Sequence, residues 1–280
     1  MRHAYLILAH RDLPMLEKLL QLLDNPNNHI FVHLDKKSGI DPSKIKSIPI
    51  LSKLTFTTRL DIRWGEASQP RAYLNILKTA YNFDDFDWFH FISGSDIPLM
   101  PIANINVWYE NQHGIHAVID IENAGEREIR LKYYYFRVNH HIQRILNFIQ
   151  KITRINRLKK IKEKFPTIFY GSAWFDLTPH AVKIILDNES SINQIVPFTT
   201  CSDELLFHTV LGNSNLRLHK DYHRYIDWSD KLPNPKTLTI EDYDKIIQSG
   251  AFFARKLDSS ISKDLIMLLD KHNTITDCRN

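Results

Sequence analysis

The chain has 280 residues, enough to bury a sizeable core either as one large α/β domain or as a core with an appended lobe. Its hydrophobic fraction of 43% is that of an ordinary globular protein, and no run of about eighteen apolar residues is present to span a membrane. The formal net charge of +4 hides an asymmetry, because residues 144–164 carry a net charge of +7 and the remainder is close to −3.

The first residues do not resemble a targeting segment. The apolar run at 4–9 is too short for the hydrophobic region of a signal peptide, and no small-residue cleavage site follows it. The two cysteines, Cys201 and Cys278, form no recognisable disulfide framework. We therefore expect a reduced protein in the cytoplasm.

Residues 4–34 have the pattern of a strand, a helix and a second strand. The apolar run at 4–9 is followed by leucines at helical spacing after Pro14, with Asp12 as the expected cap, and then by a second apolar run at 29–34. This order predicts parallel neighbouring strands joined by a right-handed crossover.

The remaining pattern continues the alternation of strands and helices. We expect further strands at 54–57, 88–92, 116–121 and 169–177, and helices ending near residue 83 and spanning 142–165, 179–187 and 240–249. The stretch 122–135 is polar and is expected to be a loop with some strand. The sequence therefore predicts an α/β fold with a mostly parallel central sheet flanked by helices.

Ligands of such sheets bind beyond the carboxyl ends of the strands. His10, Arg11 and Asp35 directly follow the first two predicted strands, and Asp96 follows the strand at 88–92. We expect these side chains to face a common crevice.

Two adjacent carboxylates, Asp203 and Glu204, precede a strongly apolar stretch that predicts a buried helix. Thr200 and Asp203 have the spacing of a capping box, so the local pattern favours a structural role at the helix N-terminus. A catalytic role for Glu204 is the alternative, and the local pattern does not decide between them.

Five short motifs occur in a fixed order over nearly the whole chain. They are Val32–Ser38 (VHLDKKS), Ser93–Leu99 (SGSDIPL), Gly171–Phe175 (GSAWF), Ser202–Glu204 (SDE) and Phe253–Asp258 (FARKLD). Together they resemble the core-2/I-branching β-1,6-N-acetylglucosaminyltransferase family, which also contains the peptide O-xylosyltransferases.

The resemblance implies a GT-A-like, Rossmann-related fold that uses a UDP-sugar donor, inverts the anomeric carbon and needs no divalent metal. It implies a single domain over 1–280, with a nucleotide-binding half at 1–121 and an acceptor-binding and catalytic half at 122–280. With this resemblance, Glu204 is expected to be the catalytic base, and Arg224, Lys256 and Arg255 are expected to bind the diphosphate. The residues expected to bind the nucleotide are His10, Arg11, Asp35 and Asp96. The residues expected to bind the acceptor are Glu122, Arg127, Arg130 and Trp174.

The residues themselves also argue against a metal site. Asp85-Phe86-Asp87 spells the D-x-D string of many metal-dependent glycosyltransferases, but it precedes its strand and so reads as a turn. At the end of that strand only Asp96 offers a carboxylate, and a divalent ion requires several oxygen ligands. Arginine and lysine side chains are expected to neutralise the leaving diphosphate instead.

The expected activity is therefore transfer of a sugar to a glycan hydroxyl. The first candidate for the sugar is N-acetylglucosamine, the second is xylose, and another UDP-hexose is a further alternative. A lipid-linked glycan used in surface polysaccharide or glycoconjugate synthesis is one candidate acceptor. A non-catalytic protein that binds a glycan or a nucleotide on the same fold is the alternative from another functional class.

The segment 142–165 combines apolar residues at helical spacing with lysines and arginines in the gaps, which predicts one basic amphipathic helix. One interpretation is a solvated face packed on the core. The other is peripheral contact with the anionic inner face of the cell membrane. Nucleic-acid binding is disfavoured, because the rest of the chain is acidic and carries no recognition motif.

Overall fold

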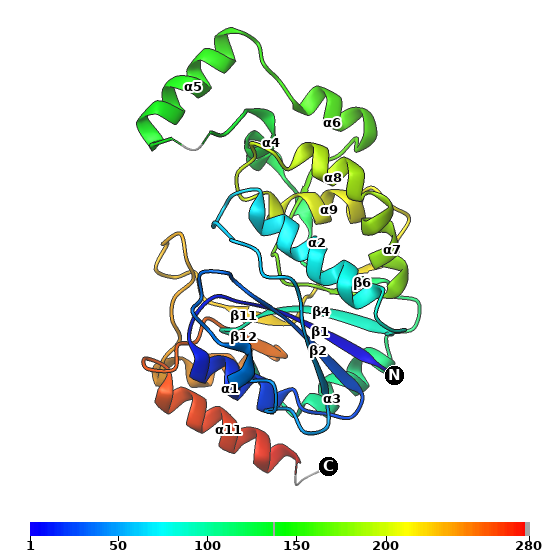
Figure 1. Ribbon diagram of the computed structural model, residues 1–280, viewed down its shortest axis with the longest axis vertical. Helices are drawn as coiled ribbons and strands as arrows, with labels where there is room; N and C mark the ends of the chain where they lie inside the picture. The colour runs from blue at the N-terminus through cyan, green and yellow to red at the C-terminus, as the bar shows by residue number, and fades with distance from the viewer. Residues whose placement is uncertain (137, 278–280) are drawn as a thin grey trace.

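The computed structural model describes residues 1–136 and 138–277, so Cys278 lies outside the described residues. A seven-stranded sheet forms the centre of the molecule, in the order β10-β6-β9-β4-β1-β2-β3 (Figure 1). Its strands are β1 (His3–Ala9), β2 (Asn28–Leu34), β3 (Lys53–Phe56), β4 (Trp88–Ser93), β6 (Ala117–Val118), β9 (Asp176–Leu177) and β10 (Leu218–His219).

Most neighbouring strands of this sheet are parallel. β1 pairs in parallel with β2 and with β4, β2 pairs in parallel with β3, and β10 with β6, whereas β9 runs antiparallel to both of its neighbours. The predicted βαβ opening and the predicted α/β class with a mostly parallel central sheet are therefore confirmed.

The central strand β1 is buried along its whole length because helices cover both faces of the sheet. Its side chains alternate between the faces, as the period of two residues in a strand requires. Ala4, Leu6 and Leu8 belong to the core cluster that includes residues of α2, α7 and α9, whereas Tyr5 and Ile7 belong to the cluster that includes α1 and α3.

The helices are mostly short. They are α1 (Leu13–Leu22), α2 (Ser68–Tyr81), α3 (Ile102–Glu110), α4 (Ile129–Lys132), α5 (His140–Ile152), α6 (Leu158–Lys164), α7 (Pro179–Asp187), α8 (Glu189–Ile195), α9 (Leu206–Gly212), α10 (Tyr243–Gln248) and α11 (Lys263–Asp277). As predicted, Asp12 caps α1 by accepting the Met15 amide at 3.2 Å. None of the described helices combines the length and the apolar composition needed to cross a bilayer.

Two smaller sheets extend the fold. One has the order β11-β12-β5, from Arg224–Ile226, Phe253–Arg255 and Ile97–Pro98, and the other pairs β7 (Glu122–Asn123) with β8 (Phe169–Tyr170). β11 and β12 are parallel, and β12 runs antiparallel to β5. This places the C-terminal motif containing Arg255 and Lys256 beside the loop that follows β4.

The predicted helix at 142–165 was wrong as a single element. Arg154 has a φ of 54°, in the left-handed region that ends helices, so α5 stops at Ile152. The Asn156 side chain then accepts the Leu158 amide at 3.1 Å, where α6 begins.

Other element boundaries also differ from the predictions. The strand expected at 169–177 is two short strands, β8 and β9, in different sheets, and the strand expected at 116–121 is reduced to β6. Helices α3, α8 and α11 were not predicted, and neither was α4, which lies in the stretch expected to be a loop with some strand. The central sheet takes strands from both sides of residue 121, and the division of the chain into two functional halves there stays a prediction.

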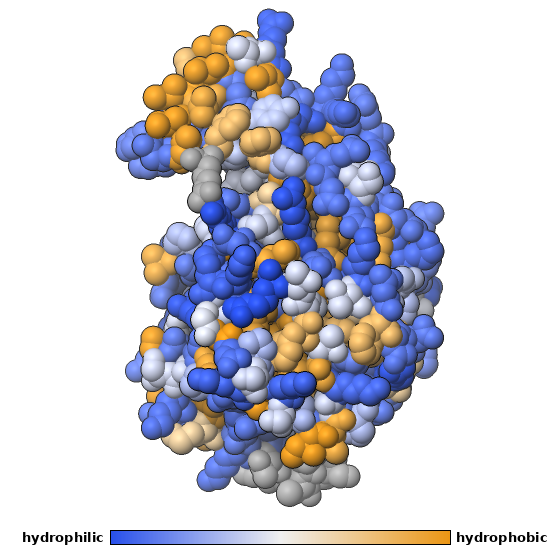
Figure 2. Space-filling model, viewed as in Figure 1, coloured by the Kyte–Doolittle hydropathy of each residue, from blue (hydrophilic) through white to orange (hydrophobic). Residues whose placement is uncertain are grey.

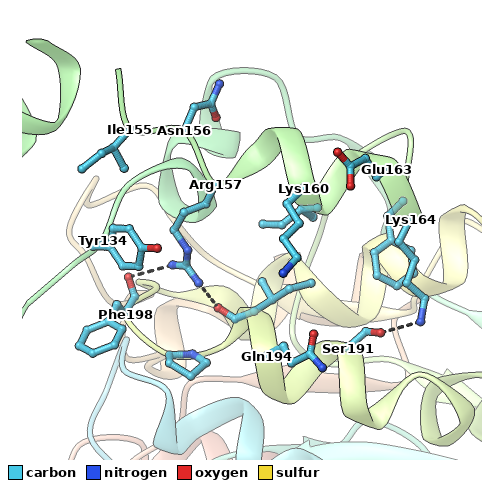
Figure 3. Close-up of a pocket in the computed structure, with 14 residues that line it drawn as sticks. Tyr134, Ile155, Asn156, Arg157, Lys160, Glu163, Lys164, Ser191, Gln194 and Phe198 are labelled. Carbon is cyan, nitrogen blue, oxygen red and sulfur yellow. Dashed lines mark hydrogen bonds between the residues drawn. The ribbon is translucent and has the colours of Figure 1, made fainter. Parts of the chain in front are cut away.

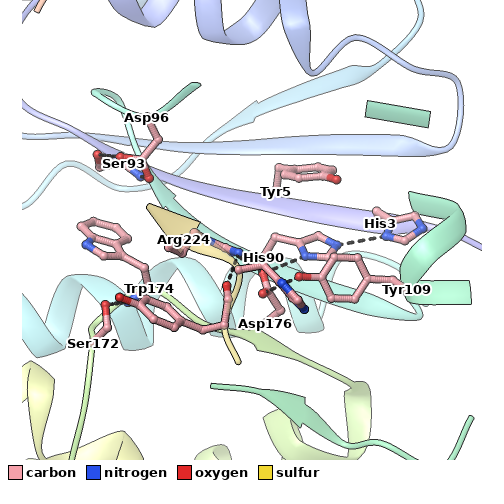
Figure 4. Close-up of polar contacts among 12 residues, drawn as sticks. His3, Tyr5, His90, Ser93, Asp96, Tyr109, Ser172, Trp174, Asp176 and Arg224 are labelled. Carbon is pink, nitrogen blue, oxygen red and sulfur yellow. Dashed lines mark hydrogen bonds and ion pairs between the residues drawn. The ribbon is translucent and has the colours of Figure 1, made fainter. Parts of the chain in front are cut away.

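A fully buried polar network connects the central sheet to β11 (Figure 4). Arg224 of β11 donates to the Asp176 carboxylate of β9 at 2.6 Å, and His90 of β4 and Tyr109 of α3 contact the same carboxylate. Burial alone would raise the pKa of Asp176, but Arg224 and His90 bring it below its usual value. The two sheets are thus joined by an ion pair from which water is excluded.

Candidate active site

A cavity of about 520 Å³ lies at the carboxyl ends of β1, β2 and β4. This is where a doubly covered parallel sheet leaves room for a ligand. It is lined by Leu8, Ala9, His10, Arg11, Asp35, Ile62, Trp64, Gln69, Tyr73, Ser93, Gly94, Ser95, Trp174, Asn234, Pro235, Arg255 and Lys256. Six of the residues singled out from the sequence are therefore together: His10, Arg11, Asp35, Trp174, Arg255 and Lys256.

The floor of the cavity is backbone at the ends of β1 and β4. A Cβ atom added at Gly94 would lie 2.8 Å from the Cβ of Ala9, so only glycine allows the two strand ends to approach this closely. The buried Asp96 carboxylate accepts the amide of Ser93 at 2.9 Å and also its hydroxyl. Asp96 shapes the turn that carries Ser93 and Ser95 and is not itself a lining residue.

Three cations gather on one side of the cavity: Arg11, Arg255 and Lys256. Partial burial and the neighbouring charges of Arg11 and Arg255 lower the pKa of Lys256. Partial burial, together with Arg11 and Lys256, lowers the pKa of His10. The lowered pKa values of Lys256 and His10 report the positive charge gathered here, so this side of the cavity favours an anionic ligand.

Arg255 is the best-placed donor of the three. Its guanidinium lies 4.2 Å from the centre of the Trp174 ring, and its nearest carboxylate is that of Asp96, 3.7 Å from Nε. Nε and Nη1 are buried, yet neither has a hydrogen-bond partner among the described residues. A buried guanidinium with two unused N–H groups at a cavity is prepared for oxygen atoms from a ligand.

Asp35 lies at the carboxyl end of β2, beside the end of β1. Its Oδ1 accepts the Lys37 amide at 2.8 Å, and its own amide donates to the carbonyl of Ala9 at 2.8 Å. Since Asp35 is buried and lines the cavity, its remaining acceptor capacity is available to a ligand, as expected for a residue that contacts a nucleotide base.

The lining residues missed in the sequence include Trp64, Gln69 and Tyr73, and also Ile62, Asn234 and Pro235. Trp64 is 67% exposed beside the cavity, and the Tyr73 ring lies 6.0 Å from that of Trp174. Gln69 and Tyr73 share one face of α2 by their four-residue spacing, but in the sequence that spacing is typical of a core-facing helix.

Glu204 lies beside the cavity without lining it. It ends the 3₁₀ turn Ser202–Glu204, and its carboxylate is half-buried. Oε2 accepts a hydrogen bond from Nη1 of Arg130 at 2.6 Å, and no residue of the described chain donates to Oε1. The neighbouring Asp203 connects Glu204 to the cavity, because its Oδ2 accepts from the lining residue Gln69 at 2.7 Å.

The predicted capping box was wrong. Cys201 precedes the turn with a φ of 45°, and no side chain caps either this turn or α9. Asp203 instead points into the protein toward Gln69, because the turn is fixed by the Cys201 amide, which donates to the carbonyl of Gly65 at 2.8 Å. The two carboxylates have separate surroundings, one buried and one facing Arg130.

The residues predicted to bind an acceptor do not all lie together. Arg127 pairs with Glu122 at 3.1 Å on an exposed loop, and the guanidinium groups of Arg127 and Arg130 both lie over the Tyr170 ring, at 4.1 and 5.7 Å. This group adjoins Glu204, whereas Trp174 belongs to the cavity. A charged and aromatic surface therefore borders Glu204 on the side of α4.

Arg224, whose predicted contact with a diphosphate stays a prediction, does not line the cavity. Its side chain is 1% exposed, its charge is paired with Asp176, and its Nη1 donates to the carbonyl of Tyr222 at 2.8 Å. An arginine whose charge is already paired inside the protein is poorly available to a ligand. Arg11 takes its place among the cations at the cavity.

A second, larger cavity of about 1040 Å³ lies between α6 and α8 (Figure 3). Arg157 forms part of its wall by donating to the carbonyl of Ile195 at 2.6 Å and lying 4.8 Å from the Tyr134 ring centre. No predicted site residue lines this cavity, and it is far from the strand ends. We therefore place the candidate active site at the smaller cavity.

A family model described as "Core-2/I-Branching enzyme" matches residues 3–247. The chain belongs to this family. The matched residues include Glu204 and every strand that borders the cavity except β12. The family predicted from the five motifs is therefore confirmed. Among the described residues, no group of three or more His, Cys, Asp or Glu side chains is arranged to hold a metal ion.

Two relatives show the extent of the similarity. The chain is 23% identical to xylosyltransferase 2 of Mus musculus over 97% of its own length and 33% of that protein. It is 27% identical to the β-glucuronosyltransferase GlcAT14B of Arabidopsis thaliana over 91% of its own length and 62% of that protein. Membership and these names support the prediction that the chain is a glycosyltransferase. The chain spans a third to two thirds of their lengths.

Among solved structures, the chain is similar to residues 1–349 of TarS from S. aureus, with a TM-score of 0.41 and 12% identity. That similarity covers 78% of this chain and 57% of the other.

We predict that Asp203 makes stability depend on pH. Burial, and then the charge of Glu204, raise the pKa of Asp203 to about 7. Between the usual value near 4 and about 7 the folded chain keeps a proton that the unfolded chain releases, so stability falls as pH rises through this window. Full ionisation costs on the order of 4 kcal/mol, and Asp203→Asn removes that cost.

Urea unfolding of the wild type and of Asp203→Asn at several pH values between 4 and 8 measures the difference. Asp244→Asn, which changes an exposed carboxylate, serves as the matched control. Parallel pH profiles for wild type and Asp203→Asn would contradict the prediction.

Proposed function

We propose that the protein transfers a sugar from a UDP-sugar to a glycan hydroxyl with inversion at the anomeric carbon. The observation that carries the proposal is the cationic side of the cavity, where Arg255 has two unused buried N–H groups beside Lys256 and Arg11. Cations of this kind neutralise a diphosphate as it leaves, which stabilises the transition state of sugar transfer.

Asp35 and His10 are proposed to contact the nucleoside, since they lie at the ends of β2 and β1 in the same cavity. Trp174 and Tyr73 offer aromatic surface to the donor, and Trp174 also supports the Arg255 guanidinium. Asp96 is proposed to act through the turn it shapes rather than by direct contact.

Glu204 is proposed as the catalytic base. Inversion is a single displacement, so one base must remove the acceptor proton as the hydroxyl attacks the anomeric carbon. Arg130 occupies Oε2 and holds the carboxylate in place, which leaves Oε1 to receive the acceptor hydroxyl. Arg127 and Tyr170 then border the place where the acceptor would lie.

The donor sugar is proposed to be N-acetylglucosamine, with xylose, glucuronic acid and other hexoses as alternatives. Xylose and glucuronic acid are supported by the names of the relatives. The acceptor is proposed to be a glycan or lipid-linked glycan for surface polysaccharide or glycoconjugate synthesis, handled at the cytoplasmic face of the cell membrane. A non-catalytic binding protein is the alternative, and absence of both transfer and UDP-sugar hydrolysis with a full donor set would favour it.

Replacing the base should separate catalysis from binding. We expect Glu204→Gln to bind UDP as tightly as the wild type and to lose about 100-fold or more in turnover, because a neutral amide cannot accept the proton. Calorimetric UDP binding and donor turnover measure the two effects, and Glu241→Gln, at an exposed position, is the control. Turnover above a tenth of the wild-type rate would exclude Glu204 as the base.

If Arg255 and Lys256 bind the diphosphate, replacing either one should weaken the affinity for UDP. We expect Arg255→Gln and Lys256→Gln each to weaken UDP binding by about 10- to 100-fold, the value of a hydrogen bond to a charged group. Lys245→Gln, at an exposed position, is the control.

In the same series Arg224→Gln should chiefly reduce stability, by about 3–5 kcal/mol, because it leaves Asp176 buried without its partner. A folded Arg224→Gln with lost UDP affinity, beside unaffected Arg255 and Lys256 variants, would return the diphosphate role to Arg224.

Metal independence is proposed because three cations already lie on one side of the cavity, where they could neutralise a diphosphate. We expect transfer to persist in excess EDTA. Complete loss of activity that Mg²⁺ or Mn²⁺ restores would contradict this.

A further inference from the structure

Helix α5 is attached to the protein by its polar side. Gln150 is buried, its Oε1 accepting the Tyr134 amide at 2.7 Å and its Nε2 donating to the Tyr134 carbonyl at 3.0 Å. Two turns earlier, Gln143 accepts the Phe136 amide at 2.8 Å and donates to Asn147. These polar side chains lie on one face of the helix and hold it against residues 134–136.

The opposite face is apolar and faces solvent. Ile142, Ile145, Phe148, Ile149 and Ile152 recur at spacings of three and four residues and are 45–65% exposed. We call these five residues the apolar face of α5. Figure 2 shows the hydrophobic surface gathered over α5, where the helix stands away from the body of the molecule in Figure 1.

This orientation is the reverse of what a soluble helix adopts. An amphipathic helix on a globular protein turns its apolar stripe to the core, where each large side chain contributes about 1.5–3 kcal/mol of burial. Phe136, Val138, Ile155 and Phe198, in the segments that flank and hold the helix, are also 37–50% exposed. Five large apolar side chains gathered on one exposed helix face mark an interaction site.

Cations accompany the apolar face. Arg144 and Lys151 lie on α5, Arg154 follows it, and Lys159 and Lys160 begin α6. Within the part of the chain that the structure describes, none of the five has an ion-pair partner, whereas Lys162 is paired with Glu128. Arg144 and Lys151 therefore place uncompensated positive charge on the helix that carries the apolar face, and the other three lie in the segments that follow it.

We propose that α5 lies on the surface of an anionic lipid bilayer, with its apolar face among the acyl chains and its cations among the lipid headgroups. An apolar stripe flanked by lysine and arginine is the combination that such a surface binds. A second copy of the chain fits less well, because apposing two such faces would bring their unpaired cations together. The docking does not depend on the sugar-transfer chemistry.

Residues 134–136, to which α5 is bound, directly follow α4, which carries Arg130, the partner of Glu204. The proposed docking helix is thus held by the segment next in the chain to the element that carries the partner of Glu204.

The test is co-sedimentation of the full chain with vesicles, without donor or acceptor. We expect binding to phosphatidylcholine vesicles that contain about a third phosphatidylglycerol, weaker binding at high salt, and little binding to pure phosphatidylcholine. Ile145→Gln with Phe148→Gln should reduce the bound fraction at least about tenfold, and Arg144→Gln with Lys151→Gln about threefold or more.

Two matched variants guard against general effects of surface changes. Ile50→Gln with Leu51→Gln alters exposed apolar residues elsewhere, and Lys44→Gln with Lys46→Gln removes exposed cations elsewhere; neither should change binding. Circular dichroism and thermal unfolding confirm that each variant is folded. No binding of the wild type to anionic vesicles, equal binding by the Ile145 and Phe148 variant, or a dimer that this variant dissociates would overturn the proposal.

Discussion

The buried ion pair between Arg224 and Asp176 connects the framework of the protein to its candidate active site. Asp176 belongs to β9 of the central sheet, and Arg224 begins β11 of the small sheet. β11 pairs in parallel with β12, whose last residue is Arg255. The position of Arg255 at the cavity thus depends on a contact made one strand away, in a site that water does not reach.

The same network explains why Arg224 is buried in an ion pair whereas Arg255 lines the cavity. Arg224 enters the interior with Asp176, while Arg255 reaches the cavity with a distant carboxylate and an aromatic ring. Isolated buried charge is costly, so an arginine either brings its counter-ion with it or keeps access to solvent or ligand. Arg255 has two unsatisfied N–H groups, which is the condition of a residue that awaits an anion.

The part of the site that follows from strand order was predictable from the sequence. His10, Arg11 and Asp35 come directly after buried parallel strands, and such ends meet at one edge of a sheet. Gln69 and Tyr73 could not be recognised in this way, because their spacing predicts that they share a face of a helix but not that this face borders a cavity. Asp203 has the sequence signature of a cap, and only the fold shows that it accepts from Gln69 across 134 residues of chain.

Hydrophobic periodicity identifies an amphipathic helix but not the direction that its apolar side faces. The spacing of Ile145, Phe148 and Ile152 fits a helix packed on a core as well as one on a lipid surface. The direction is set by Gln143 and Gln150, whose side-chain amides bond the backbone of Tyr134 and Phe136 and so hold the polar side inward. Holding Gln150 inward while five large apolar side chains face water leaves their burial energy unused, and an apolar phase over the helix would supply it.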